Sequence, residues 1–235
     1  LTKNNYQYGF IILLAPYALL LTAILTAYTR LKQYTIGITS KKKMTFSVQR
    51  HLLTSNFKWY SIAVLLNTAG LLSGPLIIYY LSSKIAPYFA AILYLIAQSV
   101  DAITAPIAGI LYDRYGRKIL TFPFIFSIIP TILAFTLNVN LQITAIILWG
   151  IIYGMQESIY RAAVSDIAPK EAKGLAYGVF YNLYGIGAFI SGTIFGLIWD
   201  LHLNTTAFIY TITLQAIATT LLIKSLKKSE PYKGN

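Results

Sequence analysis

The chain has 235 residues, of which 57% are hydrophobic and only 11% are charged, and it contains no cysteine. A soluble domain carries about 25% charged residues, so this composition excludes an ordinary soluble protein, and the lack of cysteine excludes disulfides and thiolate chemistry. The net charge of +12 would suggest nucleic acid binding in a soluble protein. Here the cations lie between long apolar runs, so membrane topology explains them and we expect no nucleic acid partner.

Apolar stretches of about 20 residues, the length of a membrane-crossing helix, recur along the whole chain. They predict an all-α polytopic membrane protein in the lipid bilayer, and each connection is short except residues 29–57. The seven predicted spans are 8–28, 58–81, 87–111, 119–137, 142–163, 175–199 and 205–224.

The lysines and arginines lie almost entirely on one side of these spans. Only Lys3 and Lys84 fall on the other side. By the positive-inside rule the richer side is cytoplasmic, which predicts an N-terminus outside the cell membrane and a C-terminus inside. The basic run Lys41–Lys43 is compatible with an ordinary linker or with a surface helix on anionic lipid.

The loop after span 87–111 concentrates charges and glycines in a very short connection. It holds one carboxylate, two glycines and three cations, namely Gly109, Asp113, Arg114, Gly116, Arg117 and Lys118. Gly109 allows close helix approach and Gly116 permits a tight turn. The stretch resembles the signature of the major facilitator superfamily, G-x-L-x-D-R-x-G-R-K/R. Tyr112 stands where the family often has a small residue, and we expect this difference to affect packing.

The resemblance implies a domain organisation of two six-helix halves around a central cytoplasmic loop. Residues 1–28 would then be the last helix of the N-terminal half, and 29–57 the central loop. Residues 58–226 would form the complete C-terminal half and 227–235 a cytoplasmic tail. The N-terminal half becomes an expected partner, in the same native chain or in a separate one.

Glu157 and Arg161 form the second charged group. They are spaced i, i+4 near the inner end of a span, so they share a helix face, and ionisable residues there are costly and by default functional. They resemble the E-x-x-x-R pattern of the family, which implies that they meet Asp113 and Arg117 at a cytoplasmic gate. The alternative is a self-contained pair.

A polar stripe in span 87–111 is the leading substrate-site candidate. It consists of Tyr94, Gln98 and Asp101, and Asp101 lies about 18 Å along the helix from Asp113, near the middle of the membrane. A carboxylate at that depth could bind a cationic substrate or carry a coupling proton. The alternative is a structural carboxylate bonded to a neighbouring helix.

Weaker candidates for the same cavity come from two other spans. Asn67 lies in the first span of the predicted half, where Gly74-Pro75 can interrupt the helix. Tyr181 and Asn182 lie in span 175–199. The small residues Ala188, Gly192 and Gly196 in that span predict a close helix–helix contact.

These features predict a secondary transporter that moves a small solute by alternating access. Proton-coupled efflux of a drug-like or small organic molecule is the expected mode. The alternative is a non-transporting half-transporter that acts as a membrane subunit or sensor. Catalytic motifs and metal-ligand clusters are absent from the sequence, so we expect no enzyme activity and no cofactor.

Overall fold

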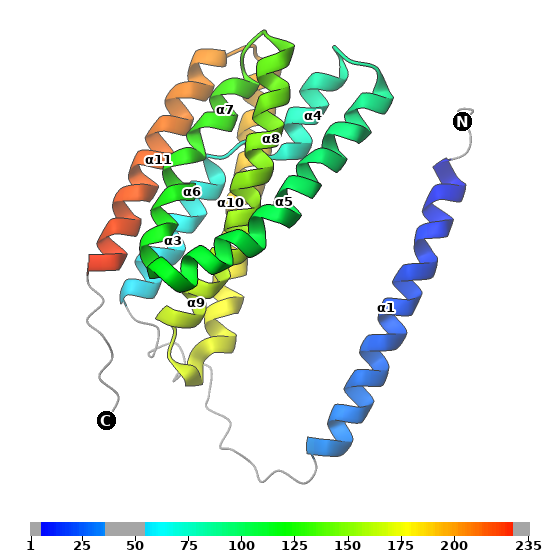
Figure 1. Ribbon diagram of the computed structural model, residues 1–235, viewed down its shortest axis with the longest axis vertical. Helices are drawn as coiled ribbons and strands as arrows, with labels where there is room; N and C mark the ends of the chain where they lie inside the picture. Colours follow the sequence, from blue (N-terminus) through cyan, green and yellow to red (C-terminus); the bar gives the residue numbers. More distant parts are fainter. Residues whose placement is uncertain (1–5, 36–54, 228–235) are drawn as a thin grey trace. The chain divides into compact units, whose positions relative to one another are not determined.

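The computed structural model describes residues 6–35 and 55–227. Every regular element in these ranges is a helix, as Figure 1 shows, and this confirms the all-α prediction. Residues 1–45 and 46–235 form two compact units, which are treated separately below. Most of the predicted central loop, including Lys41–Lys43, and residues 228–235 of the predicted tail lie outside the described residues.

The N-terminal unit contributes one long helix, α1 (Tyr6–Thr35), with Pro16 inside it. The hydroxyl groups of Thr22, Thr26 and Thr29 donate hydrogen bonds to carbonyl groups three or four residues earlier. Since a lipid environment offers no water to these groups, such internal bonds suit the helix to the predicted span 8–28.

The second unit is a bundle of helices that run along a common direction (Figure 1). Its elements in chain order are α3 (Ser55–Ala69), α4 (Gly74–Ser82), α5 (Pro87–Tyr115), η1 (Gly116–Leu120), α6 (Thr121–Phe126), α7 (Ile128–Ala134), α8 (Val139–Met155), η2 (Gln156–Tyr160), α9 (Arg161–Ile167), η3 (Lys170–Ala172), α10 (Lys173–Asp200) and α11 (Asn204–Lys227).

Within the described residues, five helical stretches are long and apolar enough to cross a membrane. They are Ser55–Ser82, Tyr88–Ala134, Val139–Ile167, Lys170–Asp200 and Asn204–Lys227. The second stretch folds back at Gly116, whose φ of 63° is a conformation that favours glycine. It therefore makes two passes, α5 and then α6–α7 (Figure 1). The six predicted spans from 58 to 224 each correspond to one helical pass.

The first pass is broken between α3 and α4. Side chains from other helices bond the backbone groups that the break releases: Thr131 accepts from Leu72 N at 3.1 Å, and Ser191 donates to Leu71 O at 2.6 Å. The interruption predicted at Gly74-Pro75 therefore lies just before these residues, which begin α4. Unpaired backbone groups are costly in a membrane, so these two bonds make the break tolerable.

Parallel helices α5 and α8 approach each other most closely at two glycines. A Cβ atom added to Gly150 would lie 2.6 Å from Ala97 O, and one on Gly154 would lie 2.7 Å from Asp101 O. The close contact predicted at Gly192 and Gly196 is wrong for the described residues, because nothing lies within 4 Å of a Cβ at either position. Small residues permit close packing, but their spacing does not show which stripe of small residues forms the helix–helix contact.

Two apolar clusters fill the bundle. One contains Tyr60 and Phe180, whose rings stack at 6.3 Å. The other contains Tyr80, which stacks on Trp199 at 3.8 Å. Between them along the first pass lies Asn67, whose side chain is completely buried. The core is therefore apolar toward both ends and polar at its middle, where the candidate site lies.

Candidate functional site

A cavity of about 260 Å³ lies among four helical passes of the bundle. Its walls come from the α3–α4 break, α5, α8 with η2, and α10. It is called the aromatic cavity here, and its lining residues are Thr68, Leu71, Ser73, Pro75, Tyr94, Gln98, Trp149, Tyr153, Gln156, Tyr184, Ala188 and Ser191.

Only part of the predicted substrate site lines the aromatic cavity. Tyr94 and Gln98 do, from successive turns of α5. Asp101, one turn further, lies instead against α8, where its Oδ1 would be 2.9 Å from a Cβ on Gly154. Asn182 is exposed and donates a hydrogen bond to Gly178 O at 3.2 Å on its own helix. The predicted stripe is therefore split between the cavity and the α5–α8 contact.

Asn67 is the centre of a buried hydrogen-bond network rather than part of the cavity wall. Its Nδ2 donates to Gln215 Oε1 at 2.7 Å and to Ser127 Oγ at 3.1 Å. Its Oδ1 accepts from Tyr160 OH at 2.7 Å and from Gln156 Nε2 at 3.0 Å. The side chain thus joins four elements and has no capacity left for a solute, so its predicted place in the substrate site finds no support.

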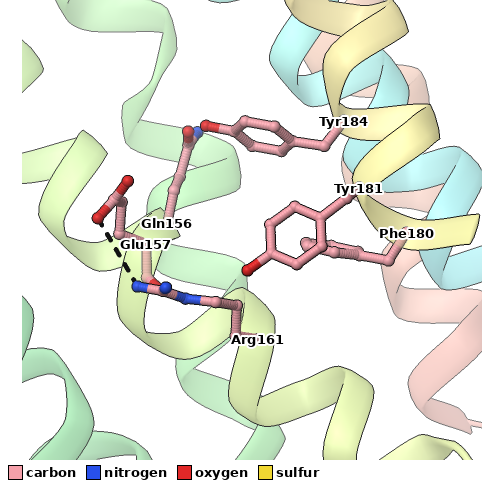
Figure 2. A pocket seen from close by; sticks show the side chains of 6 residues that line it. All are labelled: Gln156, Glu157, Arg161, Phe180, Tyr181 and Tyr184. Carbon is pink, nitrogen blue, oxygen red and sulfur yellow. Dashed lines mark hydrogen bonds and ion pairs between the residues drawn. The ribbon is translucent and has the colours of Figure 1, made fainter. Parts of the chain in front are cut away.

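A smaller cleft of about 50 Å³, the charged cleft, is shown in Figure 2. Tyr181 and Tyr184 project into it from α10, opposite the turn that carries Glu157 and Arg161. The remaining lining residues are Gln156 and Phe180. Gln156 and Tyr184 line both the charged cleft and the aromatic cavity. These two side chains therefore form the wall between a charged site and an aromatic one.

Glu157 and Arg161 pair with each other in the charged cleft. Arg161 Nη2 lies 3.7 Å from Glu157 Oε2, and Arg161 Nε also donates to the Glu157 carbonyl oxygen. Both side chains are roughly half exposed. The turn between them is the π-helix η2, a local widening that is frequent at functional sites. The predicted contact with Asp113 and Arg117 is not formed among the described residues; the self-contained pair is.

The signature loop has the backbone geometry that its glycines predict. Gly116 makes the turn with positive φ, and a Cβ on Gly109 would lie 3.3 Å from Ser158 Oγ, so α5 approaches η2 closely. Asp113 lines a third, open cleft of about 420 Å³ together with Gly116, Ala162 and Ser165. The loop thus contacts α9 without reaching the charged cleft.

The cations of this loop form no ion pair with another described residue. Arg114 stacks over the Tyr115 ring at 5.5 Å, and Lys118 is exposed while Arg117 is half-buried. The bond that ties the loop region to α9 comes instead from buried Tyr112, which donates to Asp166 Oδ2 at 2.9 Å. Neither Tyr112 nor Asp166 was expected to have a functional role.

Several lining residues of the aromatic cavity escaped sequence reasoning. Trp149, Tyr153 and Gln156 follow one another at i, i+4 and i+7, so they lie on one face of the α8–η2 pass. That spacing was the signal in the sequence that could have identified them. The sequence around Thr68 contains no such signal, because its neighbours in the cavity come from helices far along the chain.

These features define a class of protein: an α-helical integral membrane protein with a break in one membrane pass, a cavity at mid-bundle and charged turns at one end. The Major Facilitator Superfamily model matches residues 1–192. The chain therefore belongs to the major facilitator superfamily, and the resemblance inferred from the signature loop is confirmed.

The chain is also similar to individual proteins, one of which carries the same family in its name. An uncharacterized MFS-type transporter of Methanocaldococcus jannaschii is 26% identical over 93% of this chain and 56% of its own length. An uncharacterized protein of Mycobacterium tuberculosis is 35% identical over 52% of this chain and 30% of its own length. The class H tetracycline resistance protein of Pasteurella multocida is 30% identical over 51% of this chain and 30% of its length. The matched part of the chain spans between 30% and 56% of the length of these relatives.

Proposed function

We propose that this chain is part of a secondary transporter that moves a small organic solute by alternating access. Residues 58–226 would form its C-terminal half, 29–57 the central loop, 227–235 the tail, and 1–28 the last helix of the N-terminal half. The observation that carries the proposal is the aromatic cavity, because it lies at the break of a discontinuous membrane pass. Broken helices around a midplane site are the usual construction of secondary transporters.

The cytoplasmic gate would consist of two parts at the same end of the bundle. One part is the signature loop with Asp113, and the other is the Glu157–Arg161 pair. The chain turn after α5 and helix α9 lie together at the lower end in Figure 1. Tyr112 and Asp166 join the two segments. A movement of the signature loop would therefore be transmitted to α9 and, through η2, to the cavity wall.

The positive-inside rule orients this gate toward the cytoplasm. The described cations at the lower end include Arg117 of the turn after α5, Lys170 and Lys173 after α9, and Lys227 at the end of α11. Lys84, in the α4–α5 connection, lies at the other end. Lysine and arginine prefer the cytoplasmic side of short loops.

Asp101 is the proposed carrier of a coupling proton. It lies inside a membrane pass, one turn from Gln98 in the cavity wall, and makes no ion pair with another described residue. The charged side chains that act on it, Glu157 and Arg161, are paired with each other, and a membrane-embedded carboxylate that forms no ion pair of its own is costly when charged. Proton binding and release at Asp101 could therefore be coupled to whether the cavity is filled.

Efflux is the proposed direction, and tetracycline is the first solute to test, because one relative is named a tetracycline resistance protein. Inside-out vesicles that contain the native protein would be acidified in their lumen, and the pH gradient followed with a quenched dye. Added tetracycline should dissipate the gradient as protons leave in exchange. If neither tetracycline nor a panel of small aromatic solutes moves protons or accumulates, the transport proposal fails.

The coupling role is separated from transport itself by Asp101→Asn. This variant should abolish solute-driven proton release and leave exchange of labelled for unlabelled solute, which needs no proton, within about twofold of wild type. Asp200→Asn, an exposed carboxylate at the far end of α10, is the matched control and should behave as wild type. If transport by Asp101→Asn kept the pH dependence of wild type, the coupling role would be contradicted and the transport proposal would stand.

A further inference from the structure

Among the described residues, two oxygen atoms at the aromatic cavity are buried without a hydrogen-bond partner. They are Thr68 Oγ1 and Gln98 Oε1, and the Thr68 residue is only 6% exposed. Two neighbouring side chains of the wall are already used: Ser191 donates to Leu71 O, and Gln156 donates to Asn67 Oδ1. An unpartnered buried polar atom costs about 1–3 kcal/mol. A solute that supplies a donor would remove this cost.

The rest of the wall is flat and aromatic. Trp149 and Tyr153 stack with ring centroids 4.7 Å apart and planes only 16° from parallel. Trp149 can lie flat because Gly74 faces it, and a Cβ at Gly74 would be 2.6 Å from the indole ring. Tyr94 and Tyr184 complete the aromatic lining. Aromatic faces favour planar ring systems through stacking, so the cavity shape selects a flat solute.

Within the part of the chain that the structure describes, the lining of the aromatic cavity contains no Asp, Glu, Lys or Arg. The nearest charges belong to other contacts: Glu157 is paired with Arg161 in the charged cleft, and Asp101 lies against α8 at Gly154. A cation in the cavity would lose part of its hydration without gaining an anion from the lining, and only its attraction to the aromatic faces would offset that cost. An uncharged solute stacks on the same rings without that cost.

We infer that the aromatic cavity binds an uncharged planar aromatic solute that carries an N–H or O–H donor, and that Gln98 and Thr68 recognise this donor. The inference rests on the proposed transport function and names its substrate class. A donor-reading site rejects a solute without the donor because its own buried oxygen then stays unpaired.

Three matched probes test the inference by isothermal titration calorimetry on the native protein in detergent, without any gradient. 2-Quinolone is uncharged and carries a lactam N–H. 1-Methyl-2-quinolone keeps the ring and lacks the donor. 1-Methylquinolinium keeps the ring and is a cation. We expect 2-quinolone to bind at least tenfold more tightly than either of the others.

Variants show whether this selectivity arises at the two oxygens. Gln98→Leu and Thr68→Val should each weaken 2-quinolone toward the affinity of the methylated probe and leave the latter unchanged. Thr220→Val, at an exposed threonine whose hydroxyl bonds within α11, is the matched control and should bind as wild type. Loss of folding is excluded by the unchanged affinity for 1-methyl-2-quinolone.

Four outcomes would overturn the inference: equal affinity for the two quinolones, tightest binding of the cation, binding of none of the probes, or full selectivity in both variants. Selective binding without solute movement in vesicles would leave this inference intact and contradict the transport proposal. Because binding is measured without a gradient, the two failures are distinguishable.

Discussion

Tyr112 donates a 2.9 Å hydrogen bond to Asp166 and so ties the last turn of α5 to α9. Tyr112 is 5% exposed, whereas Asp166 lies at the edge of an open cleft. The tyrosine ring packs in the same apolar cluster as Tyr60 and Tyr160. The signature loop is therefore anchored to the core by Tyr112, which takes the place of the small residue that is frequent in the family.

Tyr112→Phe should keep the ring in the core and remove only this bond. A hydrogen bond to a charged group contributes about 1.5–3 kcal/mol, so we expect a measurable fall in thermal stability, followed by fluorescence in detergent. Tyr115→Phe, at an exposed tyrosine on the same helix, is the control and should not change stability. Equal stability of both variants and wild type would show that the bond does not contribute.

Gly154→Ala should strongly destabilise the bundle. The added methyl group would lie 2.7 Å from the Asp101 carbonyl oxygen, which belongs to the backbone and cannot move aside without separating α5 from α8. Overpacking of this kind costs about 1–3 kcal/mol. Thermal unfolding in detergent is the measurement.

The matched control is Gly192→Ala on α10, where no atom lies within 4 Å of the added group. Alanine is a better helix former than glycine by about 1 kcal/mol, so this variant should be neutral or slightly stabilised. A larger loss at Gly192 than at Gly154 would show that the close helix contact lies where the glycine spacing on α10 placed it.

The helical passes and the signature turn could be predicted because local patterns determine them. Span length follows from apolar run length, and the turn follows from Gly116, where positive φ requires glycine. The site could be predicted only in part. Tyr94 and Gln98 reach the cavity as expected, whereas Asn67 does not, because its partners Ser127, Gln156 and Gln215 come from helices far along the chain.

The same reason explains the outcome for the charged residues. The i, i+4 spacing of Glu157 and Arg161 predicts that they can reach each other, and they do. Whether they also reach Asp113 depends on how α5 and η2 pack, which a spacing along one helix does not contain. The domain boundaries and the gate roles remain predictions.

Asn67→Leu should be among the most damaging substitutions in the chain. Leucine is close in size, so little space is lost, but Gln215, Ser127, Tyr160 and Gln156 each lose a partner in a buried site. Unsatisfied buried groups cost about 1–3 kcal/mol each. We expect a large fall in thermal stability and poor recovery from the membrane.

The control for this network is Asn182→Leu. Asn182 is exposed and bonds only to Gly178 O one turn back on α10, so its loss should leave thermal stability unchanged. If Asn67→Leu were as stable as Asn182→Leu, the bonds around Asn67 would be replaceable. The side chain could then turn toward a solute, as the sequence predicted.

Asp113→Asn and Arg117→Ala should each lower transport at least tenfold without lowering the amount of protein in the membrane. Asp113 lies in the last turn of α5 and Arg117 in η1, and both are outside the apolar core, so their removal leaves packing intact. Transport in inside-out vesicles, divided by the protein detected on immunoblots, is the measurement. Glu171→Gln, an exposed carboxylate in the η3 turn at the same end of the bundle, is the control for general loss of negative charge. A loss in Glu171→Gln equal to that in Asp113→Asn would mean that negative charge at this end of the bundle, and not the signature loop, controls the rate.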